Sequence, residues 1–423
     1  MACPSISIIS DKDIRMKPKI ISLALCIGAI PGAQAAAFGA DLSAQCLTYD
    51  CAQMRVIKSA ITHHDPRYVP AWRALTAQAD AALSHTRYSV TDKTLVPASG
   101  DKHDYYSFGP YWWPNPDTKN GMPYIRKDGQ INPDAKTNGT DSKRMVQFSD
   151  DVRSLALAWF YNGDKQYAVK AQQMLKAWFL DKQTRMNPNL NYAQAIPGAI
   201  DGRGIGIIDT RVLIDVADSI ALLQSSGLIP AQDLAGYKKW YADYTQWLLT
   251  SRNGFEESNW YNNHGAWYDA QVTAFSLFTG QEEQARKEMD IFKLRHLASQ
   301  VNSNGEIISE TERTRSFHYT NFALAAYARM GRYGEKLNKD IWGFELDGHS
   351  MKKAFALVSG QTGKPKTEWM HQEIQYQPSE ATGPVLAAAR AYKDVDFVQS
   401  AAKLTKTNNQ DINLLIPGSV LVK

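Results

Sequence analysis

Apolar side chains recur along most of the chain every three or four residues, the spacing that places them on one face of an α-helix. Residues 150–161 show this pattern clearly, and Asn162-Gly163 should end that helix. The same spacing predicts seven further helices, at residues 165–180, 209–223, 231–249, 267–277, 282–297, 317–330 and 380–392. Short polar or glycine-containing joints should separate the helices at 162–164, 279–280 and 329–331.

This succession of helices indicates the fold class. Consecutive helices joined by short loops pack in antiparallel order, and each hairpin buries one face against its neighbours. We therefore expect an all-α protein, an (α/α) toroid with seven helical hairpins. No strand-rich block or linker divides the pattern, so residues 36–423 are expected to form a single domain.

Two segments interrupt the helical pattern. Residues 104–117 read DYYSFGPYWWPNPD, and residues 181–203 read DKQTRMNPNLNYAQAIPGAIDGR. Proline, glycine and asparagine predict ordered loops or turns here. Their aromatic side chains would expose costly apolar surface unless they pack on the toroid or stack on a sugar ring, and both interpretations stay open. The sugar-binding candidates are Tyr111, Trp112, Trp113, Tyr192 and Gln194.

The first 35 residues have the three parts of a secretory signal peptide. Lys17 and Lys19 precede a short apolar run at 20–30, and Ala33-Gln34-Ala35 supplies a cleavage site. The apolar run is too short to span a bilayer. We therefore expect a mature protein of residues 36–423 that is periplasmic or secreted.

Composition and charge narrow the possible functions. The 423 residues include 47 Lys and Arg against 43 Asp and Glu, and removal of the leader would leave 43 basic and 41 acidic residues. This balance argues against a nucleic-acid binder, which usually carries a strong basic stripe. Cys46 and Cys51 are the only cysteines of the mature chain, and in an exported protein they should form a disulfide.

Residues 257–270, ESNWYNNHGAWYDA, place a histidine among groups that could bind a carboxylate. His264 should lie in a turn before an apolar helix. Asn262 and Asn263 can donate hydrogen bonds, and Gly265 would let a ligand approach the backbone. A single histidine is more often structural than functional, so this segment alone does not identify a site.

Residues 310–321, ETERTRSFHYTN, combine two arginines with a tyrosine. Ser316 is a suitable N-cap for the following helix, which would put Tyr319 in its first turn. Arg313 and Arg315 precede the tyrosine closely, and neighbouring cations favour the phenolate and lower the pKa of a tyrosine. The alternative is a solvated cluster of surface charges.

These segments together resemble polysaccharide lyases of the alginate lyase superfamily. The matching features are NNHGAWYDAQ at 262–271, ERTRSFHYTNFAL at 312–324 and YYSFGPYWWPNP upstream, and the resemblance extends from about residue 65 to about residue 395. In family 5, the classical bacterial alginate lyases, an arginine lies seven residues before the tyrosine, where this chain has Glu312. Arg313 lies six residues before, a spacing closer to polysaccharide lyase family 38.

The resemblance implies an (α/α) toroid, a site without metal or cofactor, and β-elimination on uronic acid polymers. This reaction removes the proton from C5, beside a carboxylate whose charge must be neutralised. Asn263 suits the neutralising role, and Glu257 could share it if protonated. His264 suits the base, and Tyr319 suits the acid that protonates the departing oxygen.

The remaining candidates would bind the substrate. Arg313 would stabilise a phenolate or bind the carboxylate, and Asn262 and Arg315 would assist. In mannuronate and glucuronate, H5 and O4 are syn, so Tyr319 could act on both. In guluronate they are anti, so His264 and Tyr319 would act from opposite faces.

The main hypothesis is therefore a lyase for alginate, mannuronate-rich alginate above all, that acts as a monomer on an anionic polysaccharide without nucleic-acid or membrane partners. Glucuronan is the nearest alternative substrate. An inverting glycoside hydrolase would need two carboxylates about 6.5–9.5 Å apart, and only Asp150-Asp151 or Asp269 could be offered. A non-catalytic sugar-binding protein would need only the aromatic loop.

Overall fold

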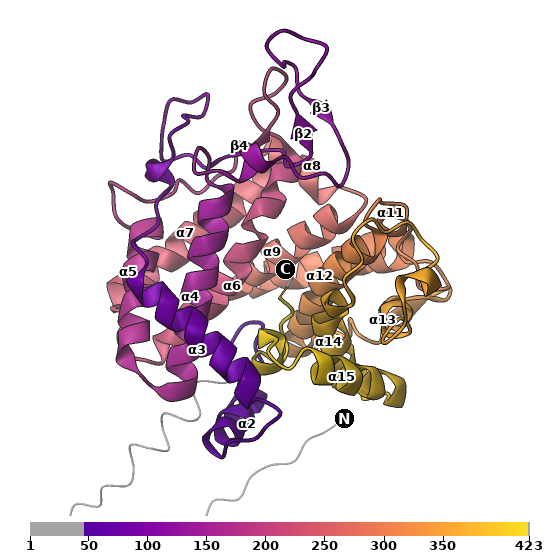
Figure 1. The fold of residues 1–423 in the computed structure, drawn as a ribbon. Coiled ribbons are helices and arrows are strands. Elements are labelled where there is room, and N and C mark those ends of the chain that lie inside the picture. Colours follow the sequence, from indigo (N-terminus) through magenta and orange to yellow (C-terminus); the bar gives the residue numbers. More distant parts are fainter. Residues whose placement is uncertain (1–45, 422–423) are drawn as a thin grey trace, which may run out of the picture.

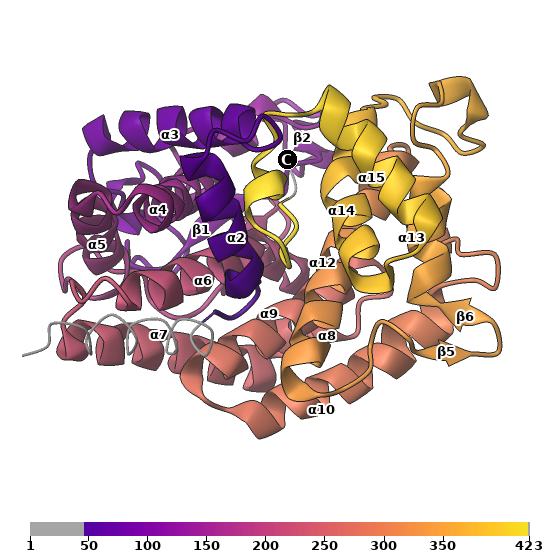
Figure 2. The same cartoon turned by 90° about the horizontal axis from the view of Figure 1, so that it is seen from below.

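The helices of the computed structural model, which describes residues 46–421, are arranged in two concentric layers (Figures 1 and 2). Neighbouring helices of the inner layer pack against one another: α4 (Ser142–Asn162), α6 (Leu213–Gln224), α9 (Asn263–Thr279), α12 (Ser316–Leu337) and α14 (Thr382–Tyr392). The outer layer covers them: α3 (Val69–Ser84), α5 (Lys165–Phe179), α7 (Ala231–Thr250), α10 (Glu282–Phe292), α13 (Met351–Ser359) and α15 (Val395–Thr407). This is the expected (α/α) toroid.

The two layers explain the burial of their helices. In the outer helix α10, Ala285, Met289 and Phe292 are buried on one side, while Glu282 and Glu283 face solvent. Each buried apolar side chain of the size of Met or Phe stabilises the fold by about 1.5–3 kcal/mol. The inner helix α6 has neighbours on all sides, and eleven of its twelve residues are buried.

The helix ends agree with the sequence at two joints and differ at a third. Gly163 (φ 79°) and Gly280 (φ 81°) end α4 and α9 in the left-handed conformation that glycine adopts easily. The predicted joint at 329–331 is wrong, because α12 continues through it. A Cβ on Gly331 would lie 2.3 Å from Cε2 of Trp342, so this glycine permits close packing and does not end the helix.

The start of α12 also differs from the prediction. Ser316 is the first helical residue and not the N-cap, and its hydroxyl accepts a hydrogen bond from the Trp369 indole (2.7 Å). The backbone N–H groups of Phe317 and His318 instead donate to the carboxylate of Glu373, at 2.9 and 3.2 Å. A distant glutamate therefore caps the helix that carries Tyr319.

The two interrupting segments lie side by side at one end of the ring. The strand β1 (Tyr106–Phe108) pairs in parallel with β4 (Tyr192–Ala195). The short strand β2 (Trp112–Trp113) pairs in antiparallel fashion with β3 (Ile125–Arg126). Residues 109–132, which we call the arm, contain this second pair and project beyond the helices (Figure 1). A third short pair joins β5 (Glu345–Leu346) to β6 (His349–Ser350).

The ring closes where the two described ends of the chain meet. The expected Cys46–Cys51 disulfide forms, next to α2 (Cys51–Thr62). The Asp50 N–H donates to the Pro417 carbonyl at 2.6 Å, and the short helix η7 (Ile412–Leu415) packs between α3 and α14. The predicted signal peptide lies outside the described residues. Within them, no helix is long and apolar enough to cross a bilayer.

Candidate active site

A cavity of about 600 Å³ lies at the end of the ring that carries the arm. Its walls come from the arm, from the beginnings of α9 and α12, and from η3 (Gly204–Val212), the helical turns that precede α6. Eight of the twelve predicted site residues line it: Tyr111, Trp112, Gln194, Asn262, Asn263, His264, Arg313 and Tyr319. Residues far apart in sequence therefore line one open cavity.

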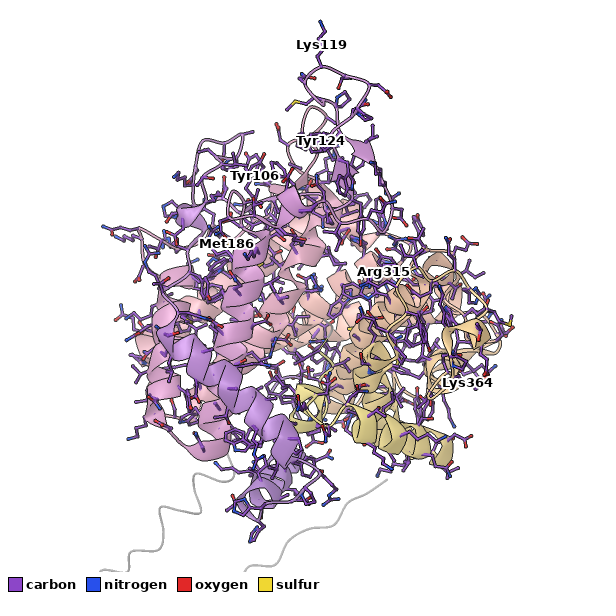
Figure 3. The ribbon with its side chains drawn as sticks, viewed as in Figure 1. Tyr106, Lys119, Tyr124, Met186, Arg315 and Lys364 are labelled. Atoms are coloured by element: carbon purple, nitrogen blue, oxygen red, sulfur yellow. A yellow bond between two sulfur atoms is a disulfide. The ribbon has the colours of Figure 1, made fainter. Side chains whose placement is uncertain are left out.

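The other four predicted residues do not line the cavity. Trp113 donates from its indole to the Gln130 carbonyl (3.0 Å). Tyr192 lies on β4 opposite Tyr106. Arg315 lies 3.6 Å from the Glu380 carboxylate, on the α12 side of the ring (Figure 3).

Glu257 is the fourth of these residues, and it contacts His264 instead of lining the cavity. It is fully buried, and its Oε1 lies 2.9 Å from Nδ1 of His264. Its position is beside the imidazole and outside the cavity wall, so a shared substrate carboxylate stays a prediction. A carboxylate at Nδ1 holds the ring in one orientation and leaves Nε2 as the nitrogen available to a ligand. Burial raises the pKa of Glu257, and His264 opposes that rise.

The first turn of α9 carries Asn263 and His264. Asn262 is the N-cap, and its side chain accepts from the His264 N–H at 3.0 Å. His264 therefore belongs to the helix and not to a preceding turn. A Cβ on Gly265 would lie 2.3 Å from the Trp260 carbonyl oxygen, so this glycine lets the protein's own backbone approach rather than a ligand.

Asn263 is held by Glu310, which belongs to the segment whose alternative interpretation was a solvated cluster of surface charges. Glu310, in α11 (Ile308–Thr311), is fully buried and accepts from both the backbone N–H and the Nδ2 of Asn263, the latter at 2.8 Å. Burial raises the pKa of Glu310 to about 7, and the two hydrogen bonds oppose that rise. The second N–H of the amide remains for a substrate.

Tyr319 is buried, at 6% exposure, and Arg313 and Tyr111 are among the groups that contact it. The guanidinium of Arg313 lies 3.8 Å from the centre of its ring, and its hydroxyl is hydrogen-bonded to that of Tyr111. Burial raises the pKa of Tyr319 above its ordinary value and Tyr111 adds to this, while Arg313 opposes it. Arg313 lowers this pKa as predicted, but desolvation outweighs the cation and the net shift is upward.

Asp128 connects the arm to the segment that carries Arg313 and Tyr319. Its carboxylate pairs with Arg313 at 3.0 Å and with Arg126 at 2.7 Å, and the Thr314 hydroxyl donates to it at 3.3 Å. Gly129 packs against Thr314, since a Cβ there would lie 2.4 Å from its hydroxyl oxygen. These contacts fix the guanidinium over Tyr319.

Most of the charged residues that line the cavity were not predicted from the sequence. Five Lys or Arg side chains but only two Asp carboxylates line the cavity, so it favours an anion. The missed polar and aromatic residues are Arg126, Asp128, Lys136, Arg203, Asp209, Arg211, Trp260, Tyr261, Ser309, His318 and Phe322. Within residues 46–421, no group of three or more His, Cys, Asp or Glu side chains is placed to hold a metal ion.

Comparison with known proteins gives the class to which this fold and site belong. A sequence model described as alginate lyase matches residues 89–369. A crystal structure of an alginate lyase from Bacteroides ovatus has 35% sequence identity and a TM-score of 0.84, covering 88% of this chain and 98% of that one. The protein is a polysaccharide lyase. More narrowly, the chain belongs to the alginate lyase family.

More distant structures share the fold. A Tyr-to-Phe variant of alginate lyase A1-III complexed with a tetrasaccharide has a TM-score of 0.53 at 15% identity, covering 82% of this chain and 86% of that one. Alginate lyase A1-III from Sphingomonas species A1 has a TM-score of 0.50 at 13% identity, covering 78% and 90%. No curated protein matches the sequence.

Proposed function

We propose that this lyase is an exported, monomeric member of polysaccharide lyase family 38 that cleaves 1,4-linked uronic acid polymers by metal-independent β-elimination. Mannuronate-rich alginate is the proposed substrate. The observation that carries the proposal is the shared cavity of His264 and Tyr319, in which each has a fixed partner and the surrounding charge is positive. The alternative substrate, glucuronan, is an outcome of the test below.

The proposed chemistry follows from the partners of each residue. Nε2 of His264 takes H5, the electrons of that bond form the C4–C5 double bond, and the C4–O4 bond breaks. The Tyr319 hydroxyl gives its proton to O4, and Arg313 stabilises the resulting phenolate. A raised pKa keeps Tyr319 protonated beforehand, as an acid requires. Asn263 and the positive wall stabilise the charge that develops on the carboxylate.

The stereochemistry of the polymer decides how these roles are divided. In guluronate the two-residue route applies directly, since base and acid act from opposite faces. In mannuronate or glucuronate, Tyr319 would take H5 and return the proton to O4. That route requires the phenol to pass its own proton to water or to His264, which lines the same cavity, before it takes H5. Arg313, 3.8 Å from the ring centre, stabilises the resulting phenolate.

The test is the ultraviolet absorbance of the unsaturated product, measured on polymannuronate, polyguluronate and glucuronan with and without EDTA. We expect absorbance to rise fastest on polymannuronate and to be unaffected by the chelator. Release of reducing ends without absorbance would indicate a hydrolase, and binding without either would indicate a non-catalytic protein. Faster cleavage of glucuronan would assign the alternative substrate.

A further inference from the structure

A second space adjoins the cavity, and we call it the outer groove. Its volume is about 520 Å³, and Trp260, Tyr261 and Ser309 line both the cavity and the groove. The rest of the groove is lined by residues of the π-helical turn η4 (Lys293–Ala298), of the segment that follows it, and of α11 with the residue after it. Because the two spaces share three residues, a polymer bound in the cavity can continue into the outer groove.

Tyr261 gives the outer groove an exposed aromatic ring. At 66% exposure it is the most exposed aromatic side chain that lines either space. Its ring stacks on that of Trp260, with centres 6.0 Å apart and planes 21° apart. The stacked indole supports one face of the tyrosine, and the other apolar face can pack against the C–H groups of a pyranose ring.

Neutral amides supply hydrogen-bonding groups in the same groove. Asn259 donates from Nδ2 to the Phe255 carbonyl at 2.8 Å, which leaves its side-chain oxygen as an acceptor. The oxygen of the Gln300 amide lies 3.0 Å from Nδ1 of His296, which leaves the amide N–H groups as donors. Sugar hydroxyls both donate and accept, so these groups suit them.

The charge in the outer groove differs from that in the cavity. Its charged residues are Arg295 and Glu312. Arg295 already faces the buried Asp269 at 3.6 Å and donates to the Ser258 carbonyl. Burial raises the pKa of Asp269 to about 7, and Arg295 opposes that rise. Glu312 is exposed and forms no ion pair among residues 46–421, so the unpaired charge of the groove is negative.

We propose that the outer groove binds a sugar unit of the polymer beyond those in the cavity, and that it favours a pyranose without a charge. Tyr261 would pack on the ring, the amides would bind its hydroxyls, and Glu312 would repel a carboxylate. This inference rests on the proposed function and extends its substrate class. A polymer with a neutral sugar at that position should bind at least as well as a uniform polyuronate.

The first test compares Tyr261→Ala with wild type on mannuronate oligomers of increasing length. A packed aromatic face is worth roughly 2- to 10-fold in an equilibrium. KM should therefore rise by about that factor for long oligomers and much less for the shortest one cleaved, while kcat changes little. Phe255→Ala is the matched control, since Phe255 is 74% exposed but lines neither space, and its KM should stay unchanged.

Asn302→Ala separates the outer groove from the cavity, because Asn302 lines only the groove. It should show the same dependence on length as Tyr261→Ala, and it decides the question if Tyr261→Ala melts at a clearly lower temperature. Equal KM values for wild type and both variants, or a rise that is the same at every length, would overturn the proposal.

The second test is a gain of affinity. Removing an exposed like charge is worth roughly 1.5- to 5-fold, so Glu312→Gln should lower KM for long mannuronate oligomers by about that factor. The difference should vanish in about 1 M salt, where charges are screened within about 3 Å. Glu283→Gln is the matched control, because Glu283 is exposed in the first turn of α10, which follows the end of α9 away from the cavity. An unchanged or raised KM in Glu312→Gln contradicts the repulsion.

Calorimetry distinguishes this inference from the proposed function. The probes are the shortest mannuronate oligomer whose affinity depends on Tyr261 and two derivatives with mannose at one end or the other, each bound to the Tyr319→Phe enzyme. One derivative should bind at least as tightly as the parent oligomer, and weaker binding of both refutes the outer groove, whatever the turnover. Absence of unsaturated product from wild type refutes the proposed function, whatever the binding.

Discussion

Replacing Tyr319 by phenylalanine removes one oxygen atom and leaves the ring in place. The ring is 6% exposed, lies under Arg313 and contacts the His318 ring edge to face, so packing and the cation–π contact should persist. Among the described residues, the lost hydroxyl has one hydrogen-bond partner, Tyr111. We therefore expect a loss of folding stability of only about 1 kcal/mol.

The expected effect on catalysis is much larger. A general acid contributes about 10²–10⁴-fold to the rate, which corresponds to roughly 2.7–5.4 kcal/mol of activation free energy. Turnover should fall by that factor on every polymer that the enzyme cleaves. KM should change little, because the phenyl ring still fills its space.

The assay is initial-rate absorbance of the unsaturated product, with thermal melting as the check on folding. Tyr111→Phe is the control, since it breaks the same hydrogen bond but keeps the Tyr319 hydroxyl, and its turnover should fall by less than about tenfold. A Tyr319→Phe enzyme that retains more than about a tenth of wild-type turnover would refute the assignment of this tyrosine as the acid.

Four further predictions concern His264, Tyr319, Glu310 and Gly331. His264→Ala should abolish cleavage of polyguluronate, where it is the base, but leave some cleavage of polymannuronate, as product absorbance on the two polymers will show. Burial raises the pKa of Tyr319, so its hydroxyl should stay protonated between pH 7 and 9. The kcat/KM of the wild type on polyguluronate should therefore not rise over this range. A rise that is present in wild type and absent in Tyr319→Phe would mean that the phenolate is the working form. Glu310 has a folded-state pKa of about 7 against 4.5 when unperturbed, so the stability that it contributes is complete below pH 4.5 and lost as pH rises through 7. Glu310→Gln should therefore reduce the fall in Tm between pH 5 and 8, and an unchanged slope would contradict the shift. Gly331→Ala should lower Tm by displacing Trp342, despite the better helix propensity of alanine, and a raised Tm would show that the contact gives way.

The helices were predictable because their apolar spacing is local information, whereas several of their ends depend on residues elsewhere in the chain. Gly331 has the composition of a joint, and only the position of Trp342 shows that it serves packing. Ser316 has the chemistry of an N-cap, yet Glu373 supplies the acceptor from a separate segment. Asn162-Gly163 was predicted correctly because a left-handed glycine needs no distant partner.

The candidate site likewise has a part that the sequence predicts and a part that it does not. Asn263, His264, Arg313 and Tyr319 occur in two compact motifs, and the structure brings these motifs to one cavity. Three further cations of the cavity occur singly, at 136, 203 and 211, in segments without a recognisable motif. Their convergence results from the courses of η3 and of the short helix η2 (Pro133–Lys136), which no local pattern encodes.

The burial of Glu310 could not be inferred from ETER at 310–313 either, because that sequence is typical of a solvated turn. The direction of the net shift in the Tyr319 pKa could not be predicted from the sequence for a related reason. Spacing showed that a cation is near, but the degree of desolvation depends on Tyr111 and on the surrounding walls.

The meeting of the two ends of the described part of the chain at the seam of the ring means that the order of the hairpins along the gene is not fixed by the fold. Asp50 and Pro417 are already joined by a hydrogen bond, so a short peptide between residues 46 and 421 would make this part of the polypeptide circular without moving a helix. Circular permutation is tolerated where new ends fall in an exposed turn, and the turn at Gly163, between α4 and α5, lies at the end of the ring away from the arm. We expect a chain that begins at Asp164 and ends at Gly163 to form the same ring and the same cavity.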